Sequence, residues 1–433
     1  MNNKADTTIN MKQKTESGLK PKLRFPEHQD TEEWNIKQLG KYIEEFSKTS
    51  TVQDEFEVLT SARDGLVRQK DYYDNNRITE RDNIGFNIIP PNYLTYRSRS
   101  DDRRFFFNEN KLGITGIVSI YYPVFRITSG SNKFFVELLS HYSEVVGKFS
   151  IGTSQTVLSL NELKKIKLPL PIPEEQQKIA DCLSSIDELI AAQSKKLDTL
   201  KAYKKGLMEQ LFPAEGETIP KLRFPQFQDA SEWEVHELGT KTTKVGSGIT
   251  PAGGDINYTD KGRPFIRSQN IGWGELLLDD VVCIDDAIHK TFIATEISTN
   301  DVLLNITGAS IGRSAVATSI IHGGNVNQHV CIIRPKAAEL NPVFLNLYLL
   351  SQYGQRNINS FQAGGNRQGL NFFQIRSFPI PIPPKKEEQI EIADCLSSVD
   401  ELIAAQTQKL ATLKDYKKGL IQQLFPSLEE MKG

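Results

Sequence analysis

Three stretches in the second half of the chain carry side chains that can read DNA bases. Arginine pairs with guanine, and asparagine or glutamine with adenine, through two hydrogen bonds in the major groove. RPFIRSQNIG at 263–272 and QAGGNRQGLN at 362–371 supply such donors, and GSGITPAGGD at 246–255 is a small polar loop. Ordinary surface turns and base recognition both remain open as interpretations. The candidate residues of this block are Thr250, Arg263, Arg267, Ser268, Gln269, Asn270, Asn366, Arg367 and Gln368.

A basic stretch in the first half, YLTYRSRSDDRRFFFNENKLG at 93–113, mixes cations with hydroxyl groups. This combination suits contacts to phosphates and base edges. Asp101 and Asp102 favour the alternative of a solvated strand edge that pairs with itself. The block at 41–167 has 18 basic and 16 acidic residues and the block at 240–377 has 12 and 10, or +2 each, so bulk charge adds little. The candidates here are Arg97, Ser98, Arg99, Arg103, Arg104 and Lys111.

Familiar catalytic patterns are missing from the sequence. It contains no HExxH, no GxxxxGK[ST] and no GxSxG, so a zinc protease, a P-loop NTPase and an α/β-hydrolase have no support. IIPPNY at 88–93 resembles an amino-methyltransferase motif but has Ile89 where a polar acceptor is needed. We therefore expect no catalytic residue, no metal site and no cofactor bound by this chain.

Composition limits the class of protein further. A length of 433 residues predicts two to four domains, and 52 basic against 54 acidic residues give a charge of −2, so DNA contacts must come from local clusters. Four separate cysteines without a CxxC pair, no leader-like segment and no apolar run of about 20 residues predict a cytoplasmic protein without a membrane span. The polar residues 1–20 are expected to be a disordered tail.

Two segments of the chain occur twice. Residues 179–213 recur as residues 392–426, 213 positions later, with 28 of 35 identities. PKLRFPEHQDTEEWNIKQLG at 21–40 recurs as PKLRFPQFQDASEWEVHELG at 220–239 with 12 of 20 identities. The blocks between them show no comparable identity, which indicates a repeated frame that carries two unlike readers.

The longer repeat has the 4,3 spacing of apolar residues that is typical of a coiled-coil seam. A block that begins where the first helix ends and finishes where the second begins requires the two helices to be antiparallel. About 39 residues at about 1.5 Å each give a helix of roughly 58 Å, on the order of 17 base pairs of DNA. The seam residues are Ile179, Leu183, Ile186, Ile190, Leu197, Leu200, Leu207, Ile392, Leu396, Val399, Ile403, Leu410, Leu413 and Leu420.

Each block ends in alternating prolines, LPLPIP at 168–173 and FPIPIP at 378–383, which predict a stiff, extended link to its helix. Short β-rich runs such as DVLLNIT and HVCIIRP alternate with loops rich in Gly, Asn and Ser. The expected fold class is α+β, with two mixed, sheet-rich domains separated by two long helices in an antiparallel coiled coil.

The duplicated KLRFP…W…LG element, the PLPIPEEQQKIADCLSSID and PIPIPPKKEEQIEIADCLSSVD junctions and the KKGLxxQLFP helix ends resemble the specificity subunits of type I restriction–modification systems. The NVNQHV segment, with Asn327 and Gln328, and the GASIGR segment also look like family landmarks. The resemblance implies a tail at 1–20, target recognition domains at 21–173 and 214–384, helices at 174–213 and 385–426, and a tail at 427–433.

The resemblance also implies a non-catalytic DNA-binding subunit. Two methyltransferase subunits would dock on the helices and methylate adenine with S-adenosylmethionine, and restriction subunits would use ATP and Mg to translocate and cleave double-stranded DNA. Two other functions remain open from the residues alone. One is a coiled-coil scaffold that pairs protein partners without DNA, and the other is an enzyme that acts alone.

Overall fold

The computed structural model describes residues 19–63, 65–73, 82–361 and 369–427.

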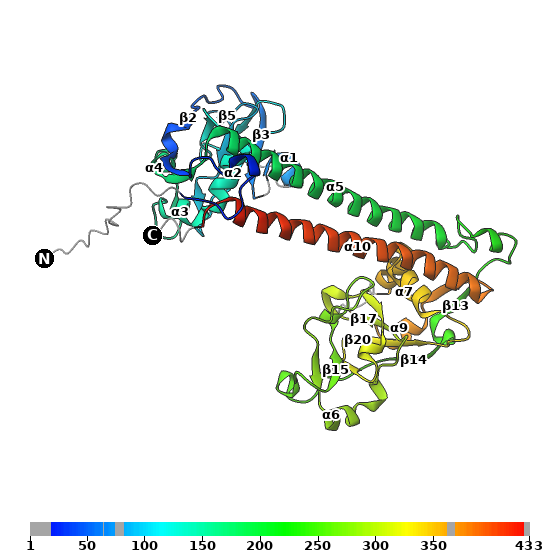
Figure 1. The fold of residues 1–433 in the computed structure, drawn as a ribbon. Helices are drawn as coiled ribbons and strands as arrows, with labels where there is room; N and C mark the ends of the chain where they lie inside the picture. Colours follow the sequence, from blue (N-terminus) through cyan, green and yellow to red (C-terminus); the bar gives the residue numbers. More distant parts are fainter. Residues whose placement is uncertain (1–18, 64, 74–81, 362–368, 428–433) are drawn as a thin grey trace. The chain divides into compact units, whose positions relative to one another are not determined.

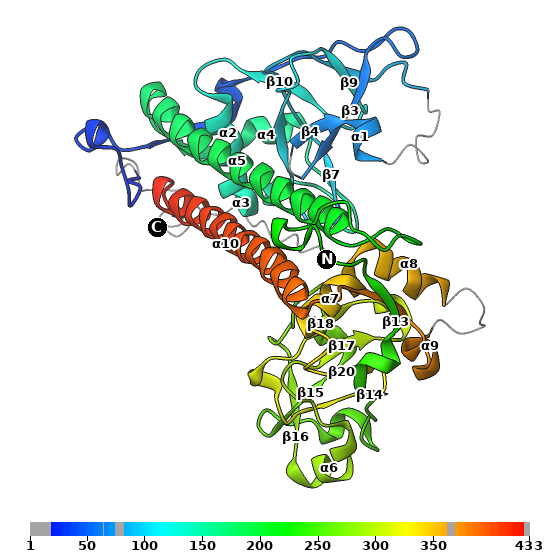
Figure 2. The same cartoon turned by 90° about the vertical axis from the view of Figure 1, so that its right-hand side faces the viewer.

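The chain divides into two compact units, and the division runs through both long helices. Unit 1 comprises the chain up to residue 194 together with residues 409 onward, and unit 2 comprises residues 195–408. The long helices are α5 (Pro173–Leu211) and α10 (Lys386–Leu424), drawn in green and red in Figures 1 and 2. Each unit therefore contains one sheet-rich block, a part of α5 and a part of α10.

Both helices end two residues earlier than predicted. Pro173 begins α5, because the first turn of a helix needs no N–H partner and tolerates the fixed φ of proline. At the other end, the helix stops before Phe212, whose side chain is fully buried, and Pro213 prevents the helix from continuing. The second helix begins one residue later than expected, at Lys386.

The two helices are antiparallel, as the chain order predicted. In unit 1, Asp187 near the start of α5 lies 2.7 Å from Lys417 near the end of α10. In unit 2, Lys204 near the end of α5 lies 2.7 Å from Asp400 near the start of α10. Asp400 and Lys417 follow Asp187 and Lys204 by the 213 residues of the repeat (400 − 187 and 417 − 204), so both units use the same ion pair.

The predicted seam residues lie on the covered side of the helices. Ten are under 10% exposed and the other four, Ile190, Leu200, Ile403 and Leu413, are half-buried. The helix ends do more than pair with each other, because Ile179 and Leu183 belong to the core of the unit 1 block and Ile392 and Leu396 to that of unit 2.

In unit 1 the block contains two four-stranded sheets. One has the order β2 (Ile43–Glu45), β10 (Val124–Ile127), β6 (Leu94–Tyr96), β8 (Phe107–Glu109), and the other β4 (Gly65–Arg68), β3 (Glu57–Ala62), β9 (Gly116–Val118), β5 (Asn87–Ile89). A short pair, β7 (Arg99–Ser100) and β11 (Thr156–Val157), lies apart from them. The block's helices are α1 (Gln69–Tyr72), α2 (Asn132–His141), α3 (Ser143–Lys148) and α4 (Leu160–Lys165).

In unit 2 the main sheet has the order β14 (Thr242–Ser247), β20 (Val330–Pro335), β17 (Val302–Asn305), β18 (Ser314–Val316). A second sheet has the order β16 (Val282–Ile284), β15 (Arg263–Ile266), β19 (Asn325–Val326). Figure 2 shows β14, β17 and β20 side by side, with α7 (Pro342–Leu350) beside them. The other helices of the block are α6 (Asp286–Thr291), α8 (Gln352–Ser360) and α9 (Phe372–Arg376).

The proline runs form strands, which corrects the expectation of a bare extended link. β12 (Lys167–Leu170) pairs with β1 (Asn35–Gln38), and β21 (Pro379–Ile382) pairs with β13 (Glu234–Glu237), all antiparallel. A two-stranded sheet accepts alternate prolines because each strand has one side without a neighbour, where no N–H is needed. In each unit, the repeated KLRFP…W…LG element thus supplies the strand that pairs with the proline run leading into the long helix.

The residue after each long helix packs into the core of a sheet-rich block. Phe425, after α10, belongs to the core of the unit 1 block, and Phe212, after α5, to that of the unit 2 block. In unit 1, Phe425 after α10 stacks on Phe134, with ring centroids 5.5 Å apart, and meets Trp34 edge-on at 6.0 Å. In unit 2, Phe212 after α5 lies 5.3 Å from Phe344 and 6.4 Å from Trp233. The aromatic pairs explain why the repeat ends in LFP.

A buried ion pair secures the repeated element to the start of a helix in each unit. Arg24 binds both carboxylate oxygens of Glu175 at 2.8 and 2.7 Å, with the two side chains 3% and 1% exposed. Hydrogen bonds to Glu175 raise the pKa of Arg24 against the effect of burial. Arg223 and Glu388 repeat the arrangement at 2.8 and 2.9 Å. None of the helices in the described part of the chain has the length and apolarity of a membrane span.

Candidate nucleic-acid interface

One edge of unit 2 gathers the loops that the sequence singled out. β14 and β17 are both antiparallel to β20, so they end at the edge where β20 begins. β15 and β19 are parallel and also end together. The backbone N–H of Gly248 donates to Asn327 O at 3.2 Å, and the N–H of Asn327 donates to Ile266 O at 3.0 Å. We call the residues of these loops, 248–251, 267–270, 306–313 and 327–329, the unit 2 edge.

Gly248 lets two of these loops meet. A Cβ atom at this position would lie 1.5 Å from the carbonyl oxygen of Val326, so any other residue would push the two loops apart. This close approach gives the glycine of the GSGIT segment a physical role.

A chain of polar side chains runs across the unit 2 edge. The hydroxyl group of Thr250 donates to Gln328 Oε1, Gln328 Nε2 lies 3.1 Å from His329 Nε2, and His329 Nδ1 lies 2.6 Å from Thr307 Oγ1. Because an amide nitrogen only donates, His329 Nε2 accepts and Nδ1 carries the proton in this arrangement. Gln328 is exposed and keeps a second N–H for a ligand.

Arg267, Ser268 and Gln269 lie beside this chain. The guanidinium group of Arg267 stands over the ring of Tyr258 at 5.5 Å and donates to Asp280 O at 2.9 Å. Gln269 is exposed and bonds to the carboxylate of Asp280. The carbonyl oxygen of Ser268 accepts from Asn305 Nδ2 at 2.8 Å, which joins this loop to the end of β17.

Asn270 has a supporting role in place of the predicted base contact. It is fully buried, and its amide nitrogen donates to Leu277 O at 3.0 Å and to Asp280 Oδ1 at 2.8 Å. Its side-chain oxygen accepts from the N–H of Arg267 at 3.0 Å. Asn270 therefore shapes the loop that presents Arg267 and Gln269, because its own hydrogen-bonding groups are occupied.

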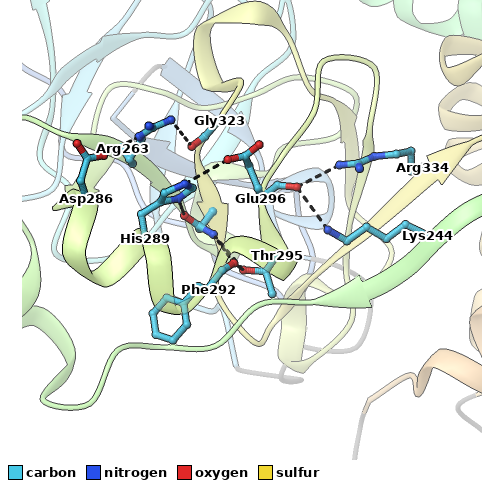
Figure 3. A network of polar contacts seen from close by, with 10 residues as sticks. Lys244, Arg263, Asp286, His289, Phe292, Thr295, Glu296, Gly323 and Arg334 are labelled. Atoms are coloured by element: carbon cyan, nitrogen blue, oxygen red, sulfur yellow. Dashed lines mark hydrogen bonds and ion pairs between the residues drawn. The ribbon is translucent and has the colours of Figure 1, made fainter.

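Arg263 begins β15, at the end of this strand opposite to the unit 2 edge, and it belongs to the network shown in Figure 3. Its guanidinium group pairs with Asp286 at 2.9 Å and donates to Gly323 O at 3.4 Å. In the same network, His289 lies 3.2 Å from Glu296, whose carbonyl oxygen accepts from Arg334 at 3.1 Å. These contacts tie α6 to the strands, and they hold Nε of Arg263 against Asp286 and Nη1 against Gly323 O.

Cys331 on β20 is a core residue of this unit. Burial raises the pKa of its thiol to about 12, so it stays protonated. Asn366, Arg367 and Gln368 fall outside the residues that the structure describes. The neighbouring Leu370 donates its N–H to Ile306 O at 2.9 Å, so the described end of their loop reaches the unit 2 edge.

In unit 1 the predicted cations separate into two groups. Arg103, Arg104 and Lys111 line a cleft of about 1180 Å³ between the sheets, α2 and the long helices. Arg97 is exposed, and Arg99 lies 3.8 Å above the ring of Tyr121, outside the residues that line the cleft. Ser98 is only 8% exposed, because β7 pairs next to it.

The cleft contains residues that the sequence pattern did not single out. Arg63 stands 5.7 Å from the ring of Phe106, and Lys133 and Lys148 come from α2 and α3. These cations are far from 93–113 in the sequence, so only the fold brings them together. Similarly, His329 and Thr307 of the unit 2 edge were missed, although His329 lies within the NVNQHV segment and Thr307 immediately precedes the GASIGR segment.

A charged cluster holds the unit 1 block on the helices. Lys133 of α2 binds Asp187 and lies 2.8 Å from Glu137, and Lys417 lies 2.7 Å from Asp187 and 3.1 Å from Glu137. Burial opposes the ionisation of Asp187, yet hydrogen bonds from Lys133 and Lys417 lower its pKa overall. Asp187 therefore stays ionised at neutral pH.

The fold defines a class of protein with two sheet-rich domains on paired helices. The S subunit of a type I restriction–modification system from M. genitalium has this fold, with a TM-score of 0.58 at 13% identity over 94% of this chain and 99% of that one. A structure described as the basis of assembly and conformational transition of a type I R-M system matches with a TM-score of 0.55 at 16% identity, covering 91% of this chain and 98% of that chain.

The chain belongs to the family of the type I restriction modification DNA specificity domain, which matches it twice, at residues 30–202 and 231–415. The putative specificity subunit of the type I restriction enzyme MjaX from Methanocaldococcus jannaschii is 26% identical over 63% of this chain and 62% of the relative. The EcoBI specificity subunit from Escherichia coli is 24% identical over 63% of this chain and 59% of the relative. The match thus spans about three fifths of these relatives.

Proposed function

We propose that this chain is the DNA specificity subunit of a type I restriction–modification complex. Each recognition domain binds one half of a bipartite double-stranded DNA site, and the helices set the spacing and hold two modification subunits. The observation that carries the proposal is the unit 2 edge, where donor-bearing loops distant in sequence converge within a domain of the specificity family.

Chemistry in this proposal belongs to partner subunits in the cytoplasm. The modification subunits bind S-adenosylmethionine and methylate adenine N6, and the restriction subunits use ATP and Mg to cleave DNA. This chain places the duplex so that its partner can flip the adenine. A coiled-coil scaffold without DNA contact is not favoured, because the family match covers both blocks.

Half-site binding tests the proposal. In a complex of the chain with its modification subunits, Gln328→Ala should weaken protection of one half-site and Arg99→Ala that of the other. A lost base contact costs about 1–3 kcal/mol, so affinity for the cognate site should fall roughly five- to 150-fold. Footprinting on cognate and scrambled DNA measures both effects.

Matched controls are Gln226→Ala in unit 2 and Lys22→Ala in unit 1, exposed residues on the repeated elements. These two changes should leave both half-sites protected. An equal loss of affinity for cognate and scrambled DNA would reduce Gln328 and Arg99 to phosphate contacts. An unchanged footprint in both variants would remove them from the interface.

A further inference from the structure

Gln328 is the exposed member of the chain of polar side chains that crosses the unit 2 edge, whereas Thr250, Thr307 and His329 are half-buried. Its amide group is held on both sides. Oε1 accepts from the hydroxyl group of Thr250, and Nε2 donates to His329 Nε2 at 3.1 Å. Among the described residues, these are the hydrogen-bonding partners of the amide. An amide has two N–H donors and an oxygen with two lone pairs, so one donor and one acceptor position remain for a ligand.

The imidazole of His329 couples the orientation of this amide to a proton. His329 Nδ1 lies 2.6 Å from Thr307 Oγ1 and carries the proton, so the lone pair of Nε2 faces the amide nitrogen of Gln328. A half-turn of the amide would set two acceptors against each other until the imidazole changed its tautomer. The pair of Thr307 and His329 therefore selects which atom of the amide is the donor.

The backbone around His329 is fixed by neighbouring segments. Its N–H donates to Asn327 Oδ1 at 3.0 Å, and its carbonyl oxygen accepts from the N–H of Ile306, just after β17, at 3.0 Å. Asn327 itself is buried and joins the loops of Gly248 and Ile266 through its backbone. The amide of Gln328 is thus ordered before a ligand arrives, which lowers the entropic cost of binding.

One free donor beside one free acceptor matches a single kind of base edge in the major groove. Adenine presents the acceptor N7 next to the donor N6, and guanine presents two acceptors, N7 and O6. Cytosine presents a donor at N4, and thymine presents an acceptor at O4 beside a methyl group. The amide of Gln328 can therefore complete two hydrogen bonds with adenine, but only one with any of the other three bases.

We infer that Gln328 is a specificity-determining residue that reads an adenine in the major groove, and that His329, supported by Thr307, is the positioning residue that sets its orientation. Nε2 of Gln328 donates to adenine N7, and Oε1 accepts from adenine N6. The inference rests on the proposed function, because it requires duplex DNA at the unit 2 edge. It adds which base is read, through which of its atoms, and which side chain holds the reading amide in place.

Base analogues that lack one atom or group test the two hydrogen bonds separately. 7-Deazaadenine removes the N7 acceptor and purine removes the N6 amino group, and each replaces one adenine at a time in the DNA site bound by the complex of this chain with its modification subunits. At one adenine of the half-site of unit 2, either analogue should weaken binding roughly two- to twelvefold. In Gln328→Ala the same analogues should cause no further loss there, because the partner of both groups is gone. Adenines of the other half-site are the control, at which both chains should respond alike.

Two variants of His329 separate positioning from general support. His329→Leu removes the acceptor for Gln328 Nε2, so the amide turns freely. The preference for adenine over guanine at that base pair, roughly five- to 150-fold in the natural chain, should then fall severalfold. His329→Gln returns an acceptor oxygen and should keep part of the preference. Both variants should bind scrambled DNA as the natural chain does.

His322→Leu is the matched control, because this exposed histidine precedes β19 (Asn325–Val326) at the end opposite to the unit 2 edge. It should keep the full preference for adenine. Competition binding followed by fluorescence anisotropy measures all these affinities. If Gln328→Ala stayed as sensitive to both analogues as the natural chain at every adenine, the reading role would be overturned and the proposed function would stand. An equal loss for all four bases in both His329 variants would overturn the positioning role, and a natural complex that protects no DNA site would overturn the proposed function as well.

Discussion

Single residues in this protein take their roles from burial more than from type. Asn270 and Gln328 are both amide side chains in loops that the sequence marked, but one is fully buried and occupied and the other is exposed. Sequence composition predicted that donors gather in these loops. It could not separate the donors that shape a loop from those that face outward, because that depends on hydrogen bonds such as the one from Asn270 to Leu277 O.

The buried pair of Arg24 and Glu175 gives a prediction at this scale. Arg24→Met leaves a carboxylate buried without its partner and should destabilise the chain by about 3–5 kcal/mol. Urea unfolding of the variant, followed by circular dichroism, measures the loss. Arg24→Met combined with Glu175→Leu should recover most of it, because no buried charge is left. A double variant as unstable as the single one would show that the hydrogen bonds of Arg24 to Thr31 O and Glu32 O matter more than the charge.

Among the elements, the long helices were the most predictable and the sheets the least. A repeat of 3.5 residues over 35 positions identifies a helix and its covered side, and the order of the chain fixes the antiparallel direction. Strands of three or four residues, such as β6 and β9, carry too little pattern to be placed. The proline runs were misjudged because their pairing with β1 and β13 depends on segments roughly 130–150 residues away in the sequence.

The charged cluster that joins α2 to the long helices predicts an acid-sensitive contact. The folded chain lowers the pKa of Asp187, so its contribution to stability is present above the unfolded value of about 3.9 and is lost as the pH falls through the lower folded value. Asp187→Asn should reduce stability at pH 7 and abolish this part of the acid dependence. Urea midpoints measured between pH 7 and pH 3 test it. Parallel pH profiles for the natural chain and the variant would contradict the prediction.

Asp400 offers a comparison for this cluster. It forms the equivalent pair with Lys204 in unit 2. Asp400→Asn should therefore have a smaller effect than Asp187→Asn, because Asp187 binds two lysines and Asp400 is seen with one.

At the scale of the whole molecule, the proposed function assigns the spacing of the DNA half-sites to the helices. Inserting one heptad at matching places in α5 and α10 keeps the seam in register and adds about 10.5 Å, or roughly three base pairs. The preferred gap between half-sites should lengthen by that amount, as read from the methylation pattern of cells that carry the altered system. An unchanged gap would show that the helices do not act as the ruler.

The net charge of −2 also has a place at this scale. It averages over mixed surfaces such as the cleft of unit 1, where Arg63 and Lys148 lie near Glu109 and Glu144. A surface of this kind gives weak long-range attraction to DNA. Under the proposed function, specific contacts and the partner subunits therefore supply most of the affinity for DNA.

One small contact bears on the order in which the elements are connected. In unit 2, the N–H of Leu222 donates to Gln210 O at 2.9 Å, where the chain leaves α5 and enters the repeated element. In unit 1, the N–H of Leu23 donates to Gln423 O at the same distance, although no peptide links α10 to that element. The order of elements is therefore cyclic: each long helix is followed in space by a KLRFP segment, through the peptide chain in unit 2 and through a hydrogen bond in unit 1.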